Sequence, residues 1–203
     1  ATFDWHAIDR SWEFTATPYY SRVTDYIDGV RCPTSLGGSC STANLTATNN
    51  FVYLQLANQS ARLFGIDLSG KMPLGRTAVG EFGLKGLLSY TDGKNRDSGE
   101  DLYNIMPLNA RLTLTHQHGG WDNAVELVTV KSKNDGSDAR NEIETPGYSL
   151  INLRGSHSWQ QVRVDFGIEN LFDKLYYDAI YDNGGFVYVG QARRAILSAE
   201  YKF

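Results

Sequence analysis

The C-terminal segment 193–203 alternates between apolar and polar side chains and ends at an aromatic residue. Successive side chains of a β-strand point to opposite faces, so a strand over this segment has one apolar and one polar face. The apolar face carries Ala195, Leu197, Ala199, Tyr201 and Phe203. The polar face carries Arg194, Ser198, Glu200 and Lys202, with Ile196 as the exception. A sheet of such strands needs a cover for its apolar face, and no helical segment is predicted that would supply one. The pattern therefore predicts a strand whose apolar face contacts lipid, as in a transmembrane β-barrel.

The composition permits this fold and excludes several others. The chain has 203 residues and a formal net charge of −4, so its charge does not indicate nucleic-acid binding. Its hydrophobic fraction is 41% and its mean hydropathy is negative, which excludes a helical membrane protein. The longest uncharged stretch, 32–61, is rich in Ser, Thr and Asn, whereas a membrane-spanning helix needs about 20 apolar residues. A transmembrane barrel needs no such stretch, because one face of each strand is polar.

Alternation recurs along the chain in segments that are separated by turn-forming or charged residues. We predict eight complete strands and the end of a further strand at 2–5. The predicted complete strands are 12–27, 51–71, 81–90, 103–116, 123–133, 148–157, 162–177 and 193–203. Short turns alternate with long connections, and the charged stretches 91–101 and 134–144 are predicted to be solvated loops. Outer-membrane barrels have short periplasmic turns and long extracellular loops, so we expect the long loops to face outward.

Two cysteines lie in the first long loop. Cys32 and Cys40 flank a short stretch rich in Gly, Ser and Pro. This spacing favours a disulfide that closes the loop in an oxidising compartment. Free thiols and a metal site with two thiolates are the alternatives.

Several segments resemble, in the same order, the C-terminal barrel strands of TonB-dependent outer-membrane receptors. GIENLFDKLYY (167–177) followed by QARRAILSAEYKF (191–203) resembles the C-terminal signature of that family. WEFTATPYYSRVTDYI (12–27), NQSARLFGIDLSG (58–70) and TPGYSLINLRGS (145–156) resemble successive earlier barrel segments. The resemblance covers essentially residues 1–203, and it implies the C-terminal portion of an all-β, antiparallel barrel of about 22 strands. The chain begins within a strand and without a leader, so we expect the plug domain to be absent from it.

The resemblance also implies a function. The intact receptor would reside in the outer membrane of a Gram-negative bacterium and would actively import a scarce nutrient, first of all a ferric siderophore or a metal. Copper, zinc, cobalamin and saccharide ligands remain open. The implied partners are outer-membrane lipid, the receptor's own N-terminal plug domain, the TonB complex acting through the plug, and the small nutrient ligand. No nucleic acid and no cofactor are expected. A passive porin, an outer-membrane enzyme and a soluble ligand-binding barrel are the alternatives.

Two groups of side chains are candidates for the functional site. Alternation places six charged residues on the polar face, where they would line the lumen or contact the plug: Arg111, Arg154, Arg163, Asp165, Glu169 and Arg194. Aromatic residues of the last long loop would stack on a ligand: Tyr176, Tyr177, Tyr181, Phe186 and Tyr188. Both assignments are hypotheses from the pattern alone.

No catalytic or metal-binding site is predicted. Glu169 and Asp173 are two nearby carboxylates, but acid–base catalysis needs a carboxylate tuned by burial beside a substrate. We instead expect Gly167 and Asn170 to shape a bend in the strand. His116 and His118 share a strand face as two metal ligands do, yet such a pair beside a turn is more typical of a membrane interface. The chain is therefore not expected to be an enzyme.

Overall fold

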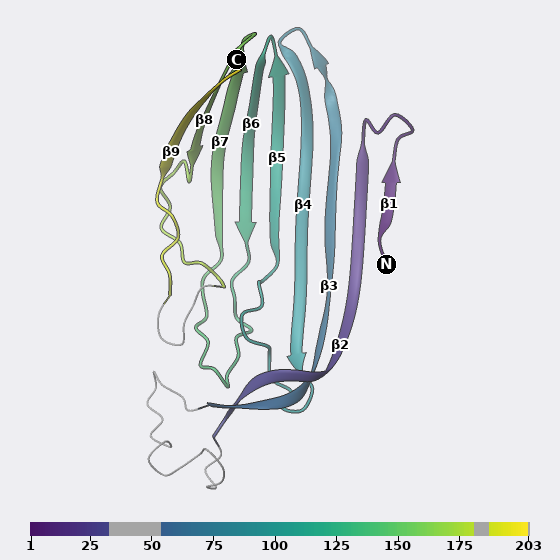
Figure 1. The fold of residues 1–203 in the computed structure, drawn as a ribbon, viewed down its shortest axis with the longest axis vertical. Coiled ribbons are helices and arrows are strands. Elements are labelled where there is room, and N and C mark those ends of the chain that lie inside the picture. The colour runs from purple at the N-terminus through teal and green to yellow at the C-terminus, as the bar shows by residue number, and fades with distance from the viewer. Residues whose placement is uncertain (33–53, 181–186, 203) are drawn as a thin grey trace.

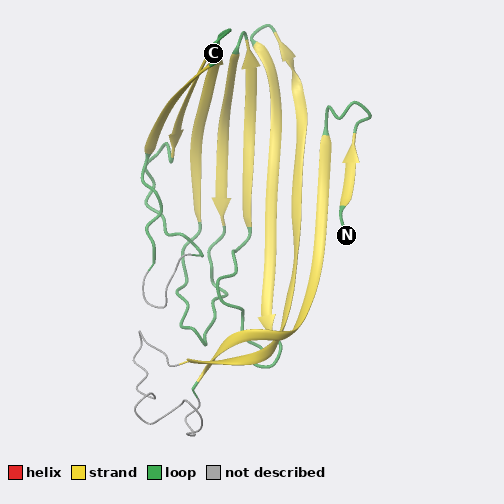
Figure 2. Ribbon diagram, in the orientation of Figure 1, coloured by secondary structure: helices red, strands yellow, loops and turns green. Residues whose placement is uncertain are grey.

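The computed structural model describes residues 1–32, 54–180 and 187–202, which form one curved antiparallel sheet (Figures 1 and 2). Nine strands of the described residues follow one another across this sheet in chain order. Their bounds are β1 (Phe3–His6), β2 (Glu13–Arg31), β3 (Leu54–Thr77), β4 (Gly80–Asn95), β5 (Asn109–His118), β6 (Trp121–Val130), β7 (Tyr148–Ser158), β8 (Val162–Glu169) and β9 (Arg194–Tyr201). Within the described ranges, no helix is long and apolar enough to cross a membrane.

The connections alternate between the two ends of the sheet. Short turns lie at the top of Figure 1, and long loops lie at the bottom. The β5–β6 hairpin closes through Gly119 and Gly120, whose φ values are 55° and 85°. A type I′ turn requires positive φ at both central residues, which a Gly-Gly pair adopts without steric cost. The predicted Gly-Gly turn is therefore a tight hairpin.

The nine strands agree with the predicted count and order, but several boundaries were wrong, including the end of β4, the start of β5 and the end of β8. β4 continues to Asn95, through residues that we predicted to be a solvated loop, because 91–95 pair with 61–65 of the longer strand β3. β5 begins only at Asn109, since the preceding residues have no strand partner among the described residues. β8 ends at Glu169 rather than at 177.

Asn170 ends β8. Its φ is 50°, and the residue is buried. Its Nδ2 donates hydrogen bonds to the carbonyl oxygens of Lys174 at 2.9 Å and Gln191 at 3.0 Å, while its Oδ1 accepts one from the Lys174 amide at 2.8 Å. Its own amide donates to Asn152 Oδ1 at 2.9 Å. The bend that we predicted within this signature segment is therefore a strand end held by a buried asparagine.

The register sorts the side chains onto two faces, because cross-strand partners lie on the same side of a sheet. One row contains Phe14, Gly70, Gly86, Leu112 and Leu127. We call the side that carries Leu112, Phe166 and Leu197 the apolar face, and the opposite side the polar face. Those three side chains are 46%, 44% and 78% exposed. No protein layer in the described part of the chain covers the apolar face, as the strand pattern predicted.

Aromatic residues mark both ends of the apolar face. Trp12, Trp121 and Trp159 are exposed near the short turns. Tyr20 and Tyr90 are exposed farther along β2 and β4, toward the long loops. Amphipathic rings at two levels of a strand surface are typical of the girdles at the two interfaces of a membrane barrel. Their spacing delimits the apolar band between them.

Candidate functional site

Glu169 links two arginines on the polar face. Arg154 Nη2 donates to Glu169 Oε1 at 3.1 Å, and Arg194 Nη2 donates to Glu169 Oε2 at 2.6 Å. Glu169 and Arg194 are direct cross-strand partners, whereas Arg154 reaches the carboxylate diagonally from β7. One carboxylate therefore joins three neighbouring strands. Two positive charges meet one negative charge at this point.

A second network lies on the same face of β5, β6 and β7. Arg111 Nε is 3.4 Å from Glu126 Oε2, and Asn152 Nδ2 donates to Glu126 Oε1 at 2.8 Å. Asn152 Oδ1 in turn accepts from the Asn170 amide at the end of β8. Polar side chains thus connect β5 continuously to the end of β8. Glu126 and Asn152 were not predicted as site residues, although strand alternation places both on the polar face.

The remaining two predicted residues of the polar face, Arg163 and Asp165, lie nearer the short turns. Arg163 Nη2 is 2.8 Å from Asp165 Oδ1 and donates to Ser156 Oγ at 3.2 Å. A polar cavity of about 370 Å³ lies beside them, and Asp122 and Ser198 contribute to its lining. It contains residues of both signs and no nucleophile paired with a base.

The register places all six predicted residues on the polar face. Their exposure is uneven: the side chains of Arg111 and Arg154 are both 58% exposed, whereas those of Glu126 and Glu169 are 13% and 22% exposed. The carboxylates lie close to the strands and the guanidinium groups extend past them. The polar face therefore presents arginine N–H donors to whatever lies opposite it. That this space is the lumen of a barrel stays a prediction.

The long loops are held together at a buried ion pair between Lys133 and Glu142. The two side chains are 2% and 0% exposed. Lys133 Nζ also donates to the carbonyl oxygen of Ala179 at 3.0 Å, and the carboxylate accepts from the amides of Asn104 at 2.8 Å and Ser137 at 2.7 Å. These partners belong to the β4–β5, β6–β7 and β8–β9 loops. Three loops therefore meet at one pair of charges.

A second junction joins the β2–β3 hairpin to the same loops. Past the register shift between Val23 and Tyr26, this hairpin bends away from the direction of the other strands (Figure 1). Buried Asp28 accepts from Asn95 Nδ2 at 3.0 Å and from Arg140 Nη2 at 3.4 Å. The Arg140 guanidinium also lies 4.9 Å from the centre of the Tyr103 ring. Burial raises the pKa of Tyr26, and the Asp28 carboxylate raises it further.

These contacts correct the prediction for the 134–144 stretch. We expected a solvated loop, but the structure places Glu142 and the Lys133 just before it in an interior shared by three loops. The same stretch is tied to the hairpin by Arg31, whose Nε donates to the Ala139 carbonyl oxygen at 3.2 Å. The long-loop end of the sheet is therefore an interlocked assembly.

The predicted aromatic ligand residues are only partly within the described structure. The Tyr176 ring lies 4.4 Å from that of Tyr148, and its hydroxyl accepts from the Gln191 amide at 3.2 Å. Tyr177 pairs with Val189 across the base of the loop, and Tyr188 is exposed. Tyr181 and Phe186 lie outside the described residues. Tyr176 therefore already has an intramolecular ring partner, and ligand contact by this group stays a prediction.

The described residues offer no assembled metal site. His116 Nε2 is within 2.8 Å of the Val79 carbonyl oxygen, and the His118 ring is 6.5 Å from the His116 ring. No group of three or more His, Cys, Asp or Glu side chains is placed to hold a metal ion in the described ranges. Cys40 lies outside those ranges, so the Cys32–Cys40 disulfide stays a prediction.

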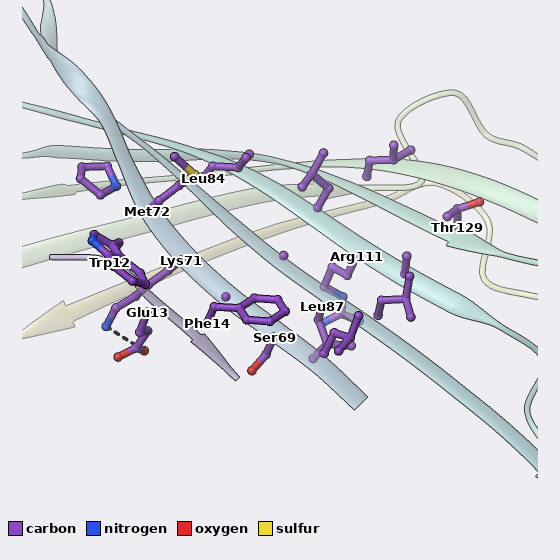
Figure 3. A pocket seen from close by; sticks show the side chains of 18 residues that line it. Trp12, Glu13, Phe14, Ser69, Lys71, Met72, Leu84, Leu87, Arg111 and Thr129 are labelled. Atoms are coloured by element: carbon purple, nitrogen blue, oxygen red, sulfur yellow. Dashed lines mark ion pairs between the residues drawn. The ribbon is translucent and has the colours of Figure 1, made fainter. Parts of the chain in front are cut away.

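An apolar groove of about 830 Å³ crosses the apolar face (Figure 3). Gly70 and Gly86 are cross-strand partners, and they leave a gap in the row between Phe14 and Leu112. Met72 and Leu84 lie along the same groove. Glu13 and Lys71 form an ion pair of 3.1 Å beside it, shown as a dashed line in Figure 3. The groove has no convergent polar groups that would orient a reactive substrate.

Comparison with known proteins assigns this architecture to a family. Residues 1–171 match the family described as TonB dependent receptor-like, beta-barrel. The chain belongs to the TonB-dependent receptor family. Proteins of this family are outer-membrane β-barrels of Gram-negative bacteria, and they are transporters rather than enzymes. The resemblance seen in the sequence is confirmed.

Curated relatives of the receptor chain include heme/hemopexin utilization protein C of Haemophilus influenzae. One such protein is 28% identical over 200 residues, which cover 93% of this chain and 26% of the relative. Another, from strain 86-028NP, is 31% identical over 173 residues, covering 78% of this chain and 21% of the relative. The receptor chain thus spans about a quarter of the length of these relatives.

Solved structures confirm the fold. The copper transporter OprC superposes with a TM-score of 0.79 and 22% identity, covering 100% of this chain and 31% of that one. The siderophore receptor PiuA from Acinetobacter baumannii superposes with a TM-score of 0.68 and 17% identity, covering 100% of this chain and 28% of that one. The nine strands therefore adopt the arrangement of one part of such a barrel.

Proposed function

We propose that this chain is the C-terminal part of the barrel of a receptor that actively imports an iron-containing nutrient, with heme as the first candidate. The family match over residues 1–171 carries the proposal. Heme is preferred because relatives 28% and 31% identical are named for heme and hemopexin utilization. The copper transporter and the siderophore receptor described above are only 22% and 17% identical, so the copper and the siderophore in their titles carry less weight. Ferric siderophores remain the second candidate.

In this proposal the polar face contacts an N-terminal plug domain. The exposed guanidinium groups of Arg111, Arg154 and Arg194 would donate hydrogen bonds to carboxylates and carbonyl oxygens of the plug. Their carboxylate partners hold them in place without covering them. TonB would act through the plug. The remaining barrel strands would pair with β1 and β9, whose outer edges carry backbone groups that lipid does not satisfy.

In the same proposal, lipid covers the apolar face. Lipid chains would fill the groove over Gly70 and Gly86, which is apolar and open along the face. Aromatic girdles at both ends of this face agree with a position across a bilayer. The long-loop assembly would then lie on the outer surface and would frame the entrance for the nutrient.

The function is tested with the full-length receptor in cells that lack other iron receptors. Growth on heme as the sole iron source is expected only when both the receptor and TonB are present. The measurement is growth together with uptake of labelled heme iron. Uptake that continues without TonB would indicate a passive porin. Uptake of copper but not of heme or ferric siderophore would disprove the iron assignment.

Replacing both Arg111 and Arg154 with alanine in the full-length receptor is expected to lower the uptake rate by about tenfold. Each partly exposed guanidinium group is expected to contribute up to about 1 kcal/mol to contact with the plug. Arg76→Ala is the matched control, because Arg76 pairs with Glu81 at a short turn and its side chain is 82% exposed. Uptake is compared at equal receptor levels. An unchanged rate in the double variant would exclude these arginines from plug contact.

A further inference from the structure

Three cations lie side by side across neighbouring strands on the apolar face. Arg22 of β2 is the cross-strand partner of Arg62 of β3, and Arg62 is the partner of Lys94 of β4. The Arg62 guanidinium lies 5.4 Å from the centre of the Phe64 ring, which belongs to the next row of the same face. Positive charges directly opposite each other destabilise a sheet unless an anion lies between them.

Only one of these cations has a carboxylate partner in the described structure. Lys94 Nζ is 2.8 Å from Asp101 Oδ1, and Asp92 lies in the row beside it. Among the described residues, no carboxylate forms an ion pair with Arg22 or Arg62, and the buried Nε of Arg62 has no hydrogen-bond partner. Residues 33–53 of the adjoining loop include no Asp or Glu. The two arginines therefore offer unused donors to an anion from outside the chain.

The row lies at the level where the apolar band ends. Met72 and Leu84, cross-strand partners near the short turns, begin the apolar rows, and Arg62 and Lys94 lie beyond the last aromatic positions of the same strands. That stretch of strand is about 33 Å long, at about 3.3 Å for each residue. With the usual tilt of about 40°, it spans about 25 Å, the height of the lipid-facing band of outer-membrane barrels. Phosphate groups of membrane lipids lie just beyond that band.

We propose that Arg22 and Arg62 together bind a phosphate group of an anionic lipid in the leaflet on the long-loop side. Two guanidinium groups on neighbouring strands supply several N–H donors to one phosphate, which neutralises their mutual repulsion. The exposed rings of Tyr20 and Tyr90 lie on the short-turn side of the row, where they contact the part of the lipid chains nearest to the phosphate groups. The site rests on the membrane position of the sheet and not on the identity of the imported nutrient.

The test measures lipid binding to the purified full-length receptor by native mass spectrometry. The probes are lipid A with its phosphate groups, lipid A without them, and inorganic phosphate alone. The wild-type receptor is expected to bind the phosphorylated lipid at least tenfold more tightly than the dephosphorylated lipid. Arg22→Gln and Arg62→Gln are each expected to weaken binding of the phosphorylated lipid about fivefold, and the double variant is expected to lose the preference.

The matched control removes two cations from the polar face of the neighbouring strands. Lys71 and Lys85 are cross-strand partners on β3 and β4, so the Lys71→Gln, Lys85→Gln variant has the same net charge as the double arginine variant. It is expected to keep the wild-type lipid preference. An equal loss in both variants would mean that overall charge, and not this row, attracts the lipid. Wild-type binding by the arginine variant would overturn the proposal.

Two further results distinguish a lipid site from a site for free phosphate and from a folding defect. Inorganic phosphate binding as tightly as the phosphorylated lipid would make the row a site for free phosphate and would overturn the lipid assignment. Arg22 is exposed and is not part of the interior. The Arg22→Gln variant is therefore expected to keep the heat-modifiable electrophoretic mobility of the folded barrel. Lipid affinity lost by a variant with that mobility supports the proposal, because folding is then unchanged.

Discussion

Substitution of Glu142 by alanine is expected to destabilise the closed β6–β7 loop by about 3 kcal/mol. The change leaves the Lys133 ammonium buried without its counter-ion, and breaking a buried ion pair in this way typically costs 3–5 kcal/mol. Lys133 is only 2% exposed, so water does not replace the lost carboxylate. The substitution also removes the acceptor of the Asn104 and Ser137 amides, which belong to two different loops.

Hydrogen exchange in the full-length receptor measures this effect. The amides of Lys133 and Thr145 donate to each other's carbonyl oxygens at 2.9 and 3.2 Å, so they report on opening of the loop. Their exchange is expected to become about 100-fold faster in Glu142→Ala, which corresponds to about 3 kcal/mol. Glu81→Ala, which breaks the exposed pair with Arg76, is the control and is expected to change stability by less than about 0.5 kcal/mol.

A double replacement separates the ion pair from simple loss of packing. Lys133→Met combined with Glu142→Leu removes both charges while keeping apolar volume, and it is expected to recover part of the loss, because no buried charge is then left unpaired. Unchanged exchange in Glu142→Ala would show that the loop assembly does not depend on this pair. Faster exchange accompanied by slower nutrient uptake would connect the assembly to the external entrance.

Replacing Leu88 with arginine is expected to lower the free energy of unfolding in lipid by about 2–4 kcal/mol, because it places a charge near the middle of the hydrocarbon. Leu88 lies on the apolar face, about midway between the Met72–Leu84 pair and the Arg62–Lys94 pair. The measurement is urea unfolding of the full-length receptor in phospholipid vesicles. The fraction of receptor that reaches the folded state in cells is expected to fall as well.

The adjacent residue provides the control. Ser89 faces the polar side, where its hydroxyl donates to Asp67, so Ser89→Arg places the new charge beside a carboxylate. It is expected to be tolerated to within about 1 kcal/mol. Equal losses from both substitutions would contradict the assignment of one face to lipid. A larger loss from Ser89→Arg would reverse the two faces.

Strand alternation was sufficient to predict most of the sheet. Arg111, Arg154 and Glu169 were assigned to the polar face from the spacing of their neighbours alone, and the register agrees. The reason is local: in an extended chain the side of each residue follows from its parity within the strand. Short turns were predictable for a similar reason, since Gly119 and Gly120 tolerate the backbone angles of a tight hairpin.

The long loops were not predictable in this way. Charges in the 91–101 and 134–144 stretches indicated solvated loops, yet Lys94 lies in β4 and Glu142 is buried. Nothing in either stretch indicates these outcomes, because 91–95 pair with residues 61–65 of β3 and the Glu142 carboxylate accepts from the Asn104 amide of another loop. The pairing of Arg22 with Arg62 could not be predicted either, since only the register of β2 and β3 makes these two residues neighbours.

The sequence by itself determined the class of fold, the order of the strands and the side of each strand that is polar, because these depend on periodicity within a segment. Only the tertiary structure decided which charges pair, where β4 ends and how the loops interlock. Those features depend on distances between residues such as Lys133 and Ala179, which are far apart in the chain. The charge of a side chain is stabilised either by water or by a buried partner, and the contacts between the loops determine which of the two applies.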